Sequence, residues 1–196
     1  AGQFGEVFLR IEPMGRGEGF DFVDETVGGS IPNQFLPAIE KGVRQVLDHG
    51  AVAGYLLQDV RVIVYDGKHH PVDSKEVAFV SAGKKAFLDA IAKARPMVLE
   101  PIVNLDVEVP DHCMGDVTGG LATKRARING TDAGRGGEII IKAQVPLAEV
   151  TEYSNELKAI SGGRGRYAIE FSHYEAVPGN IQKQLMEAFK PRVEED

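Results

Sequence analysis

The sequence lacks tryptophan, contains a single cysteine and has no surplus of basic side chains. One cysteine, Cys113, excludes an intramolecular disulfide and therefore the disulfide-stabilised secreted scaffolds. The 22 basic and 29 acidic residues give a formal net charge of −7, which argues against a protein that coats DNA through general cationic charge. No apolar run approaches the ~20 residues of a membrane-spanning helix, and no signal peptide opens the chain. We therefore expect a globular cytoplasmic protein without a membrane partner.

No nucleotide-binding motif is present either. The phosphate-binding loop G-x-x-x-x-G-K-[ST] is absent, because Gly83-Lys84 lies within a helical pattern. The glycines of residues 15–19 lie between two strand patterns, without the following helix of a dinucleotide site, so we predict a hairpin loop there. Residues 162–165 follow a helical pattern, which favours a helix stop and a turn.

The strongest candidate for metal or acid–base chemistry is a turn that contains His69, His70 and Asp73. Adjacent histidines lack the spacing of a zinc-binding helix, and no second ligand cluster is obvious nearby. Cys113 has no evident partner, since His112 beside it is expected to point away, and we predict a buried, unreactive thiol. We therefore predict no catalytic residue, no metal and no cofactor in this chain, and a small metal-dependent enzyme is the least favoured alternative.

Residues 1–98 alternate between strand and helix patterns. In the first strand an apolar face alternates with a second face made of Phe8, Arg10 and Glu12. Helical spacing covers residues 35–49, and a second helix is expected to begin at Ser74, a natural N-cap. The strand patterns lie at residues 7–12, 20–25 and 59–65.

Residues 99–177 have the order strand–helix–strand–strand–helix–strand, which is the split βαβ arrangement of ferredoxin-like domains. The two helices are predicted over residues 116–127 and 147–160, and the last strand over residues 167–174. Residues 178–196 follow as a helix and an acidic tail.

Three polar features suit contact with RNA. The turn that contains Lys68 and the two imidazoles suits an RNA backbone or base edge, and the alternative is a solvated loop. Lys124, Arg125 and Arg127 form a cationic end of one predicted helix. Arg164 and Arg166 form a second cationic cluster, and each cluster suits a phosphate or a helix C-terminus equally. Strand 138–145 carries no aromatic residue, so the second unit lacks the base-stacking sheet of RNA-recognition motifs.

Seven short motifs, in order and in spacing, resemble those of bacterial elongation factor G over essentially the whole chain. They are Gly2-Gln3-Phe4-Gly5-Glu6-Val7, Val27-Gly28-Gly29-Ser30-Ile31-Pro32, Tyr65-Asp66-Gly67 through His70-Pro71-Val72-Asp73-Ser74, Leu99-Glu100-Pro101-Ile102, Met114-Gly115-Asp116-Val117, Val145-Pro146-Leu147-Ala148-Glu149 and Gly163-Arg164-Gly165. The resemblance implies an α+β fold, with a ribosomal-protein-like βαβ domain in residues 1–98 and a ferredoxin-like domain in residues 99–177, equivalent to the fourth and fifth domains of the factor.

For function, the resemblance implies the RNA-contacting arm of a translational GTPase that promotes GTP-driven translocation of transfer RNA and messenger RNA. The GTPase domain, with its GTP and Mg²⁺, would lie elsewhere in a longer parent protein, which agrees with the missing phosphate loop and the absence of an initiator methionine. The protein is expected to act as a monomer on the ribosome.

The resemblance also implies two contact surfaces. Two tip loops, residues 27–33 and 66–74, are expected to enter the small-subunit decoding region. Their implied contact residues are Gly28, Gly29, Ser30, Ile31, Lys68, His69, His70 and Asp73. The surface implied for docking at the large-subunit sarcin–ricin loop and stalk base comprises Gly115, Asp116, Lys124, Arg125, Gly163, Arg164 and Gly165.

The chain departs from the commonest family pattern at several positions. His69-His70-Pro71 stands where the family usually has a tyrosine, a histidine and an acidic residue. In this respect the chain resembles the divergent elongation-factor-G-like paralogues. Ribosome recycling or ribosome protection is therefore an alternative role, and a stand-alone RNA-binding module is the alternative from a different class.

Overall fold

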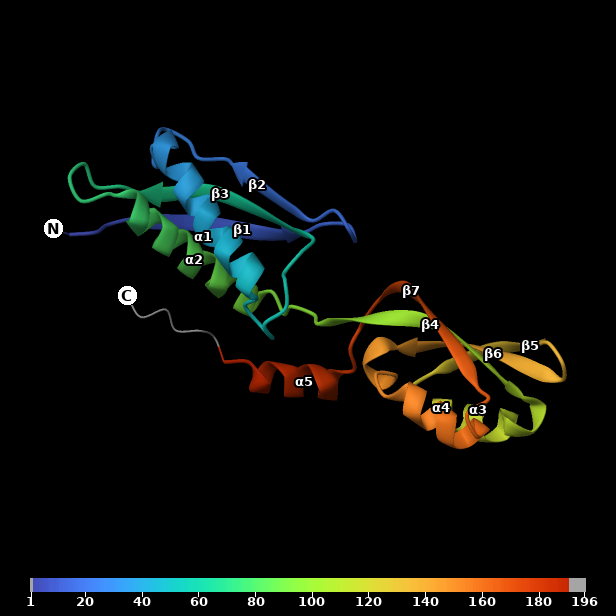
Figure 1. Cartoon of the computed structure of the whole chain (residues 1–196). Coiled ribbons are helices and arrows are strands. Elements are labelled where there is room, and N and C mark those ends of the chain that lie inside the picture. The colour runs from blue at the N-terminus through green and yellow to red at the C-terminus, as the bar shows by residue number, and fades with distance from the viewer. Residues whose placement is uncertain (1, 191–196) are drawn as a thin grey trace. The chain divides into compact units, whose positions relative to one another are not determined.

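The structure is a computed structural model that describes residues 2–190, and these residues form two compact α+β units (Figure 1). The first unit comprises the chain up to Pro96 together with helix α5 (Gly179–Ala188), and the second comprises Met97–Pro178. The mixed α+β fold class predicted from the sequence is confirmed. The observed division falls two residues before the predicted boundary at residue 98, and α5 groups with the first unit instead of forming a separate segment.

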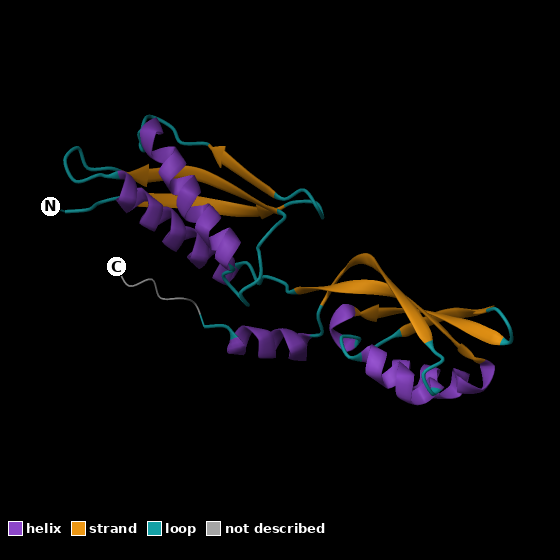
Figure 2. Ribbon diagram, in the orientation of Figure 1, coloured by secondary structure: helices purple, strands orange, loops and turns teal. Residues whose placement is uncertain are grey.

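The first unit contains a three-stranded sheet that is covered on one face by two helices (Figures 1 and 2). Its elements are β1 (Glu6–Pro13), β2 (Phe20–Asp24), a 3-10 turn (Asn33–Phe35), α1 (Leu36–His49), β3 (Val60–Lys68) and α2 (Glu76–Lys93). The sheet order is β1-β3-β2, with β3 antiparallel to β1 and parallel to β2. The predicted hairpin at residues 15–19 is therefore wrong, because β1 and β2 both pair with β3 and not with each other.

Asp59 holds the connection between β1 and β2 in place at the start of β3. Its Oδ1 accepts hydrogen bonds from the backbone N–H groups of Gly17 and Gly19, each at 3.0 Å. These bonds, the one from Gly19 first, hold the pKa of the Asp59 carboxyl below its usual range. Asp59 itself has a φ of 62°, a left-handed conformation that aspartate and asparagine tolerate better than most residues.

We expect Asp59→Ala to lower the free energy of unfolding at pH 7 by about 1–2 kcal/mol, because two backbone donors lose a charged acceptor. Since the folded pKa is lowered, this contribution is present above the unfolded aspartate pKa of about 3.9 and is lost as the pH falls through the folded value. Urea unfolding at pH 7 and at about pH 2 measures both effects. Asp59→Asn is the matched control, since it keeps an acceptor oxygen without a titrating charge. An equal loss for Asp59→Ala at both pH values would contradict the role of the charge.

Two glycines allow α1 and α2 to pack with their backbones in contact. A Cβ atom at Gly42 would overlap the carbonyl oxygen of Val80, and one at Gly83 would lie 2.7 Å from the carbonyl oxygen of Ile39. The two helices pack on the apolar faces of β1 and β3. Phe79 of α2 stacks on Phe35, with ring centroids 4.6 Å apart. The buried core residues of the unit are Ile31, Phe35, Ala38, Ile39, Val43, Val46, Leu47, Val60, Val62, Val64, Phe79, Phe87 and Ile91.

The second unit is a four-stranded antiparallel sheet in the order β5-β6-β4-β7. Its elements are β4 (Leu99–Pro110), α3 (Met114–Ala122), β5 (Arg127–Ala133), β6 (Glu138–Pro146), α4 (Tyr153–Ser161) and β7 (Arg166–Ala176), with 3-10 turns at Asp111–Cys113 and Leu147–Glu149. This connectivity and strand order are those of the predicted ferredoxin-like domain.

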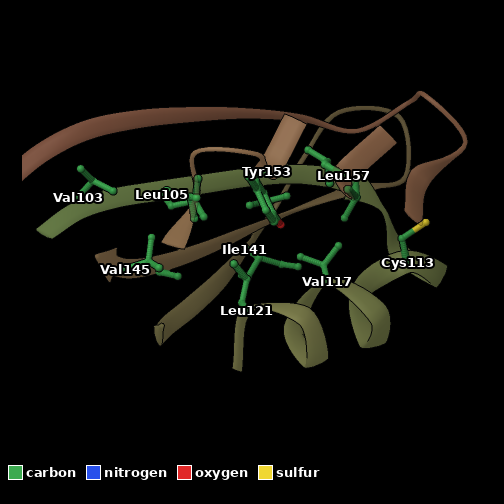
Figure 3. Packing of buried hydrophobic residues seen from close by; sticks show 13 residues of the cluster. Val103, Leu105, Cys113, Val117, Leu121, Ile141, Val145, Tyr153 and Leu157 are labelled. Carbon is green, nitrogen blue, oxygen red and sulfur yellow. The ribbon is translucent and has the colours of Figure 1, made fainter. Parts of the chain in front are cut away.

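The core of the second unit lies between its sheet and its two helices (Figure 3). Leu121 of α3 and Leu157 of α4 point toward Leu105 and Ile141 on the central strands, and all four side chains are buried. Tyr153 packs edge-to-face on Tyr167 with ring centroids 5.4 Å apart. The Tyr153 hydroxyl is buried without a hydrogen-bond partner in the described part of the chain, and burial raises the pKa of Tyr153 to about 12.

Three predicted helix boundaries are corrected by the structure. The helix expected from Ser74 begins at Glu76, because the Ser74 hydroxyl is bonded to the preceding loop and does not cap it. The helix expected over residues 116–127 ends at Ala122, because Arg125 adopts a left-handed φ of 58°. The helix expected over residues 147–160 begins at Tyr153, after a separate 3-10 turn.

Candidate functional site

The two predicted tip loops lie together at one end of the first unit, where β3 leads into α2 and β2 leads into α1 (Figure 1). The His69 ring Nδ1 is 3.2 Å from the carbonyl oxygen of Ser30, so the loops at residues 27–33 and 66–74 are in direct contact. Beneath this contact Ile31 is fully buried against Gly67, where a side chain on the glycine would overlap Ile31. Residues that are far apart in the sequence therefore form one surface.

His70 is held by the backbone of its own loop. Its Nδ1 accepts hydrogen bonds from the N–H groups of Val72 and Asp73, at 3.3 and 3.2 Å. A nitrogen that accepts carries no proton, so the neutral ring has its proton on Nε2, which makes no hydrogen bond within residues 2–190. The exposed edge of the ring therefore presents a hydrogen-bond donor.

Ser74 connects this loop to the segment before β1. Its hydroxyl accepts a hydrogen bond from the His70 N–H at 2.7 Å and donates one to the carbonyl oxygen of Phe4 at 2.9 Å. The Phe4 N–H in turn donates to the carbonyl oxygen of Asp73 at 3.0 Å. These three hydrogen bonds, together with one from the Ser74 N–H to the His70 carbonyl oxygen at 3.1 Å, fix the base of the loop that carries His70.

The other predicted tip residues differ in how accessible they are. Gly28 and Gly29 are exposed and have φ values of 69° and 72°, a conformation that glycine adopts without strain. Lys68 is 69% exposed, with its ammonium 3.7 Å from the Glu6 carboxylate. The Asp73 carboxylate lies 3.3 Å from the His70 Nδ1. Asp73 therefore lies beside the His70 ring at the tip of the unit.

Part of the predicted second surface comes together at the start of α3. Gly115 and Asp116 lie in the first turn of this helix, and both are exposed. Just before the helix, the His112 Nε2 lies 3.5 Å from the guanidinium of Arg164 in the Gly163-Arg164-Gly165 turn. The turn itself follows Gly162, which ends α4 in a left-handed conformation, as the predicted helix stop requires. The thiol of Cys113 is buried, as predicted.

Lys124 and Arg125 lie at the other end of α3 and are directed at carboxylates of their own domain. The Lys124 ammonium is 2.8 Å from Glu156, and the Arg125 guanidinium binds Glu100 through two nitrogens at 2.6 and 3.0 Å and Glu149 at 3.0 Å. The hydrogen bonds to Glu100 raise the pKa of Arg125 further above its usual range. These two side chains serve the domain's own structure, which weighs against the phosphate contact that the sequence suggested for them.

The sequence analysis missed an exposed aromatic pair, Phe8 and Tyr65, beside the tip loops. Its only sequence signal is the position of Phe8 on the otherwise charged face of the first strand. The Glu100–Arg125 pair was also missed, since nothing local links two residues 25 positions apart.

Two properties of the described residues concern metal binding and membrane spanning. Among these residues, no cluster of three or more histidine, cysteine, aspartate or glutamate side chains is placed to bind a metal ion. None of the described helices combines the length and the apolar character that crossing a bilayer requires.

Comparison with known proteins gives the class of the chain and then its family. A family model described as elongation factor G, domain IV, matches residues 1–95, and one described as the elongation factor G C-terminus matches residues 97–185. These matches place the chain among translation elongation factors and their relatives. More specifically, the chain belongs to the elongation factor G family.

Two relatives illustrate the extent of the similarity. An elongation factor G-like protein of Thermotoga maritima is 42% identical over 194 residues, which cover 99% of this chain and 28% of the relative. A crystal structure of a protein from Thermus thermophilus superposes with a TM-score of 0.75 at 39% identity, covering 94% of this chain and 27% of the other. The chain therefore spans a little more than a quarter of the length of either protein.

Proposed function

We propose that this chain is the ribosome-binding, RNA-contacting arm of a translational GTPase and that it promotes the GTP-driven movement of transfer RNA and messenger RNA. The observation that carries the proposal is the joined pair of tip loops, in which a fixed His70 presents its Nε2–H donor at the end of the domain. A donor held in place before contact loses little conformational entropy when it meets an RNA acceptor.

The chemistry of GTP hydrolysis belongs, in this proposal, to a part of the parent protein outside this chain. That part would hold GTP and Mg²⁺, while this chain binds and positions RNA without a catalytic residue or cofactor of its own. The chain would act as a monomer in the cytoplasm. The exposed loops would contact RNA in the decoding region, and the surface around Gly115, Asp116 and Arg164 would dock near the sarcin–ricin loop and stalk base of the large subunit.

The test is single-turnover movement of peptidyl-transfer RNA on purified ribosomes by the full-length parent protein. We expect His70→Ala to slow this movement about 10- to 100-fold, because the loop loses both its donor and the acceptor that folds its backbone. His70→Asn separates these roles, since an asparagine oxygen can accept the same backbone N–H bonds but cannot place a donor where Nε2 lies. His49→Ala, an exposed histidine at the end of α1, is the control and should leave the rate unchanged.

The outcomes distinguish the proposed role from its alternatives. Slow movement with both His70 variants supports direct contact through the ring edge, whereas a normal rate with His70→Asn would restrict His70 to shaping the loop. A parent protein that does not move transfer RNA, yet splits ribosomes when recycling factor is added, would be a recycling paralogue. The similarity to an elongation factor G-like protein is the observation that favours this second candidate.

A further inference from the structure

The first unit has a sheet face that none of its described helices covers (Figure 2). Side chains on this face point away from α1 and α2, and much of it is occupied by ion pairs. Arg10 on β1 reaches across β3 to Glu25 at 2.8 Å, and Arg61 on β3 binds Asp21 on β2 at 2.8 Å. The charges of this part of the face are thus already paired within the domain.

The end of this face nearest the tip loops is aromatic. Phe8 on β1 and Tyr65 on β3 are 41% and 44% exposed, and their ring centroids are 6.4 Å apart with a tilt of 41°. The pairing register skips Tyr65, because Leu9 pairs with Val64 and Phe8 with Asp66. This β-bulge inserts an extra residue and places Tyr65 beside Phe8. Bulges of this kind commonly re-aim a side chain next to a functional site.

The aromatic pair adjoins the loop that presents the cationic and imidazole groups. Tyr65 is separated from Lys68 by two residues, and His69 and His70 follow Lys68 in the sequence. The Lys68 ammonium lies 3.7 Å from the Glu6 carboxylate, but its side chain is 69% exposed, so it remains accessible to a phosphate. An unpaired nucleotide consists of a flat apolar base joined to a phosphate. The surface therefore places two aromatic rings and a set of hydrogen-bond donors side by side, which matches both parts of a nucleotide.

We propose that Phe8 and Tyr65 form a stacking platform for one unpaired RNA base, while Lys68 and the loop donors contact the adjoining phosphate. The proposal rests on the RNA-contacting function proposed above and names a further surface for it. The size of the patch favours a base over a protein partner, because two rings bordered by paired charges offer much less apolar area than the several hundred Å² of a typical protein-binding patch.

A second exposed aromatic pair serves as an internal control. Phe171 and Tyr174 on β7 have ring centroids 5.2 Å apart and are 56% and 47% exposed. No lysine or arginine occurs between residues 169 and 174. If any exposed aromatic pair bound a base, this one would bind equally well.

The test uses NMR spectroscopy of the 196-residue chain during titration with single-stranded hexa-adenosine RNA. We expect upfield shifts of the Phe8 and Tyr65 ring protons together with shifts of the Lys68 and His70 amides. Phe8→Leu and Tyr65→Leu keep apolar bulk but remove a ring face, and each should weaken binding by about 5-fold or more. Phe171→Leu should leave the affinity unchanged. The amide spectrum of each variant shows whether its fold is intact.

Three other outcomes would overturn the proposed platform, and they can be distinguished from one another. Shifts confined to residues 66–74, with unchanged affinity for Phe8→Leu and Tyr65→Leu, would leave RNA contact by the tip intact and remove the platform. Equal shifts at Phe171 and Tyr174 would show general stacking without a built site. No shift up to millimolar RNA would overturn the platform and leave a protein partner as the occupant of the patch. The translocation assay with His70→Ala tests the proposed function independently of all three.

Discussion

Arg125→Ala is expected to lower the free energy of unfolding of the second unit by about 2–4 kcal/mol. The substitution leaves the carboxylate of Glu100, whose side chain is 11% exposed, without its bidentate partner. It also removes one partner from Glu149. The left-handed conformation at position 125 costs a residue with a Cβ about 1 kcal/mol, and alanine retains that cost without the ion pair that offsets it in the native chain.

Hydrogen exchange of the amides of Leu105 and Ile141 measures this effect, and the core amides of the first unit provide a control within the same sample. A second control is the double variant Arg125→Ala with Glu100→Gln. We expect it to lose less stability than the two single changes added together, because a neutral amide costs less to bury alone than a carboxylate. Strict additivity would show that Glu100 and Arg125 do not depend on each other.

Gly42→Ala should destabilise the first unit by about 3 kcal/mol or more. In an unpacked helix this change would stabilise by about 1 kcal/mol, because alanine has the higher helix propensity. Here the new Cβ would overlap the carbonyl oxygen of Val80, which is backbone and cannot rotate away. The steric cost therefore decides the sign, and α1 must separate from α2.

Gly119→Ala is the matched control for that prediction. Gly119 also lies in a helix, α3, but a Cβ there would have no atom of residues 2–190 within 4 Å. We expect this variant to leave stability unchanged or to raise it by up to about 1 kcal/mol. Urea unfolding followed by far-UV circular dichroism, with hydrogen exchange to assign each unit, measures both variants. Similar effects of the two substitutions would mean that helix propensity, and not helix contact, governs Gly42.

The fold class was predictable because the periodic patterns are long and regular. The order of strand and helix patterns in residues 99–177 was sufficient to predict the ferredoxin-like unit. Strand neighbours were harder to predict in the first unit. The glycines of residues 15–19 look like a hairpin, but β3 lies between β1 and β2. The loop is held by Asp59, which lies 42 residues from Gly17 and 40 from Gly19.

The predicted ends of two helices were wrong for a related reason. Ser74 has the chemistry of an N-cap, but its hydroxyl is committed to Phe4 and to His70, a partner choice that only the folded chain reveals. Arg125 ends a helix in a conformation usually taken by glycine, and its long-range ion pairs offset the strain. Local patterns do not contain such contacts.

The candidate site was located by family resemblance more than by physical pattern. The residues alone suggested a polar loop at Lys68, His69 and His70, and the structure adds that Ser30 of the other loop lies against it. The ion pairs of Lys124 and Arg125 show why charge alone was a poor guide. A cluster of cationic residues in the sequence does not say whether their partners are internal carboxylates or external phosphates.

The hydrogen bonds that hold the base of the His70 loop determine how the loop responds to salt concentration. They join the Ser74 hydroxyl, the His70 N–H and the backbone of Phe4 and Asp73, all of which are uncharged groups. Dissolved ions screen interactions between charges and have little effect on such bonds. The shape of the loop should therefore be the same in dilute buffer and in the concentrated electrolyte of a cell, while its attraction to phosphates varies with ion concentration. Folding and recognition at this end of the molecule thus respond to different properties of the solution.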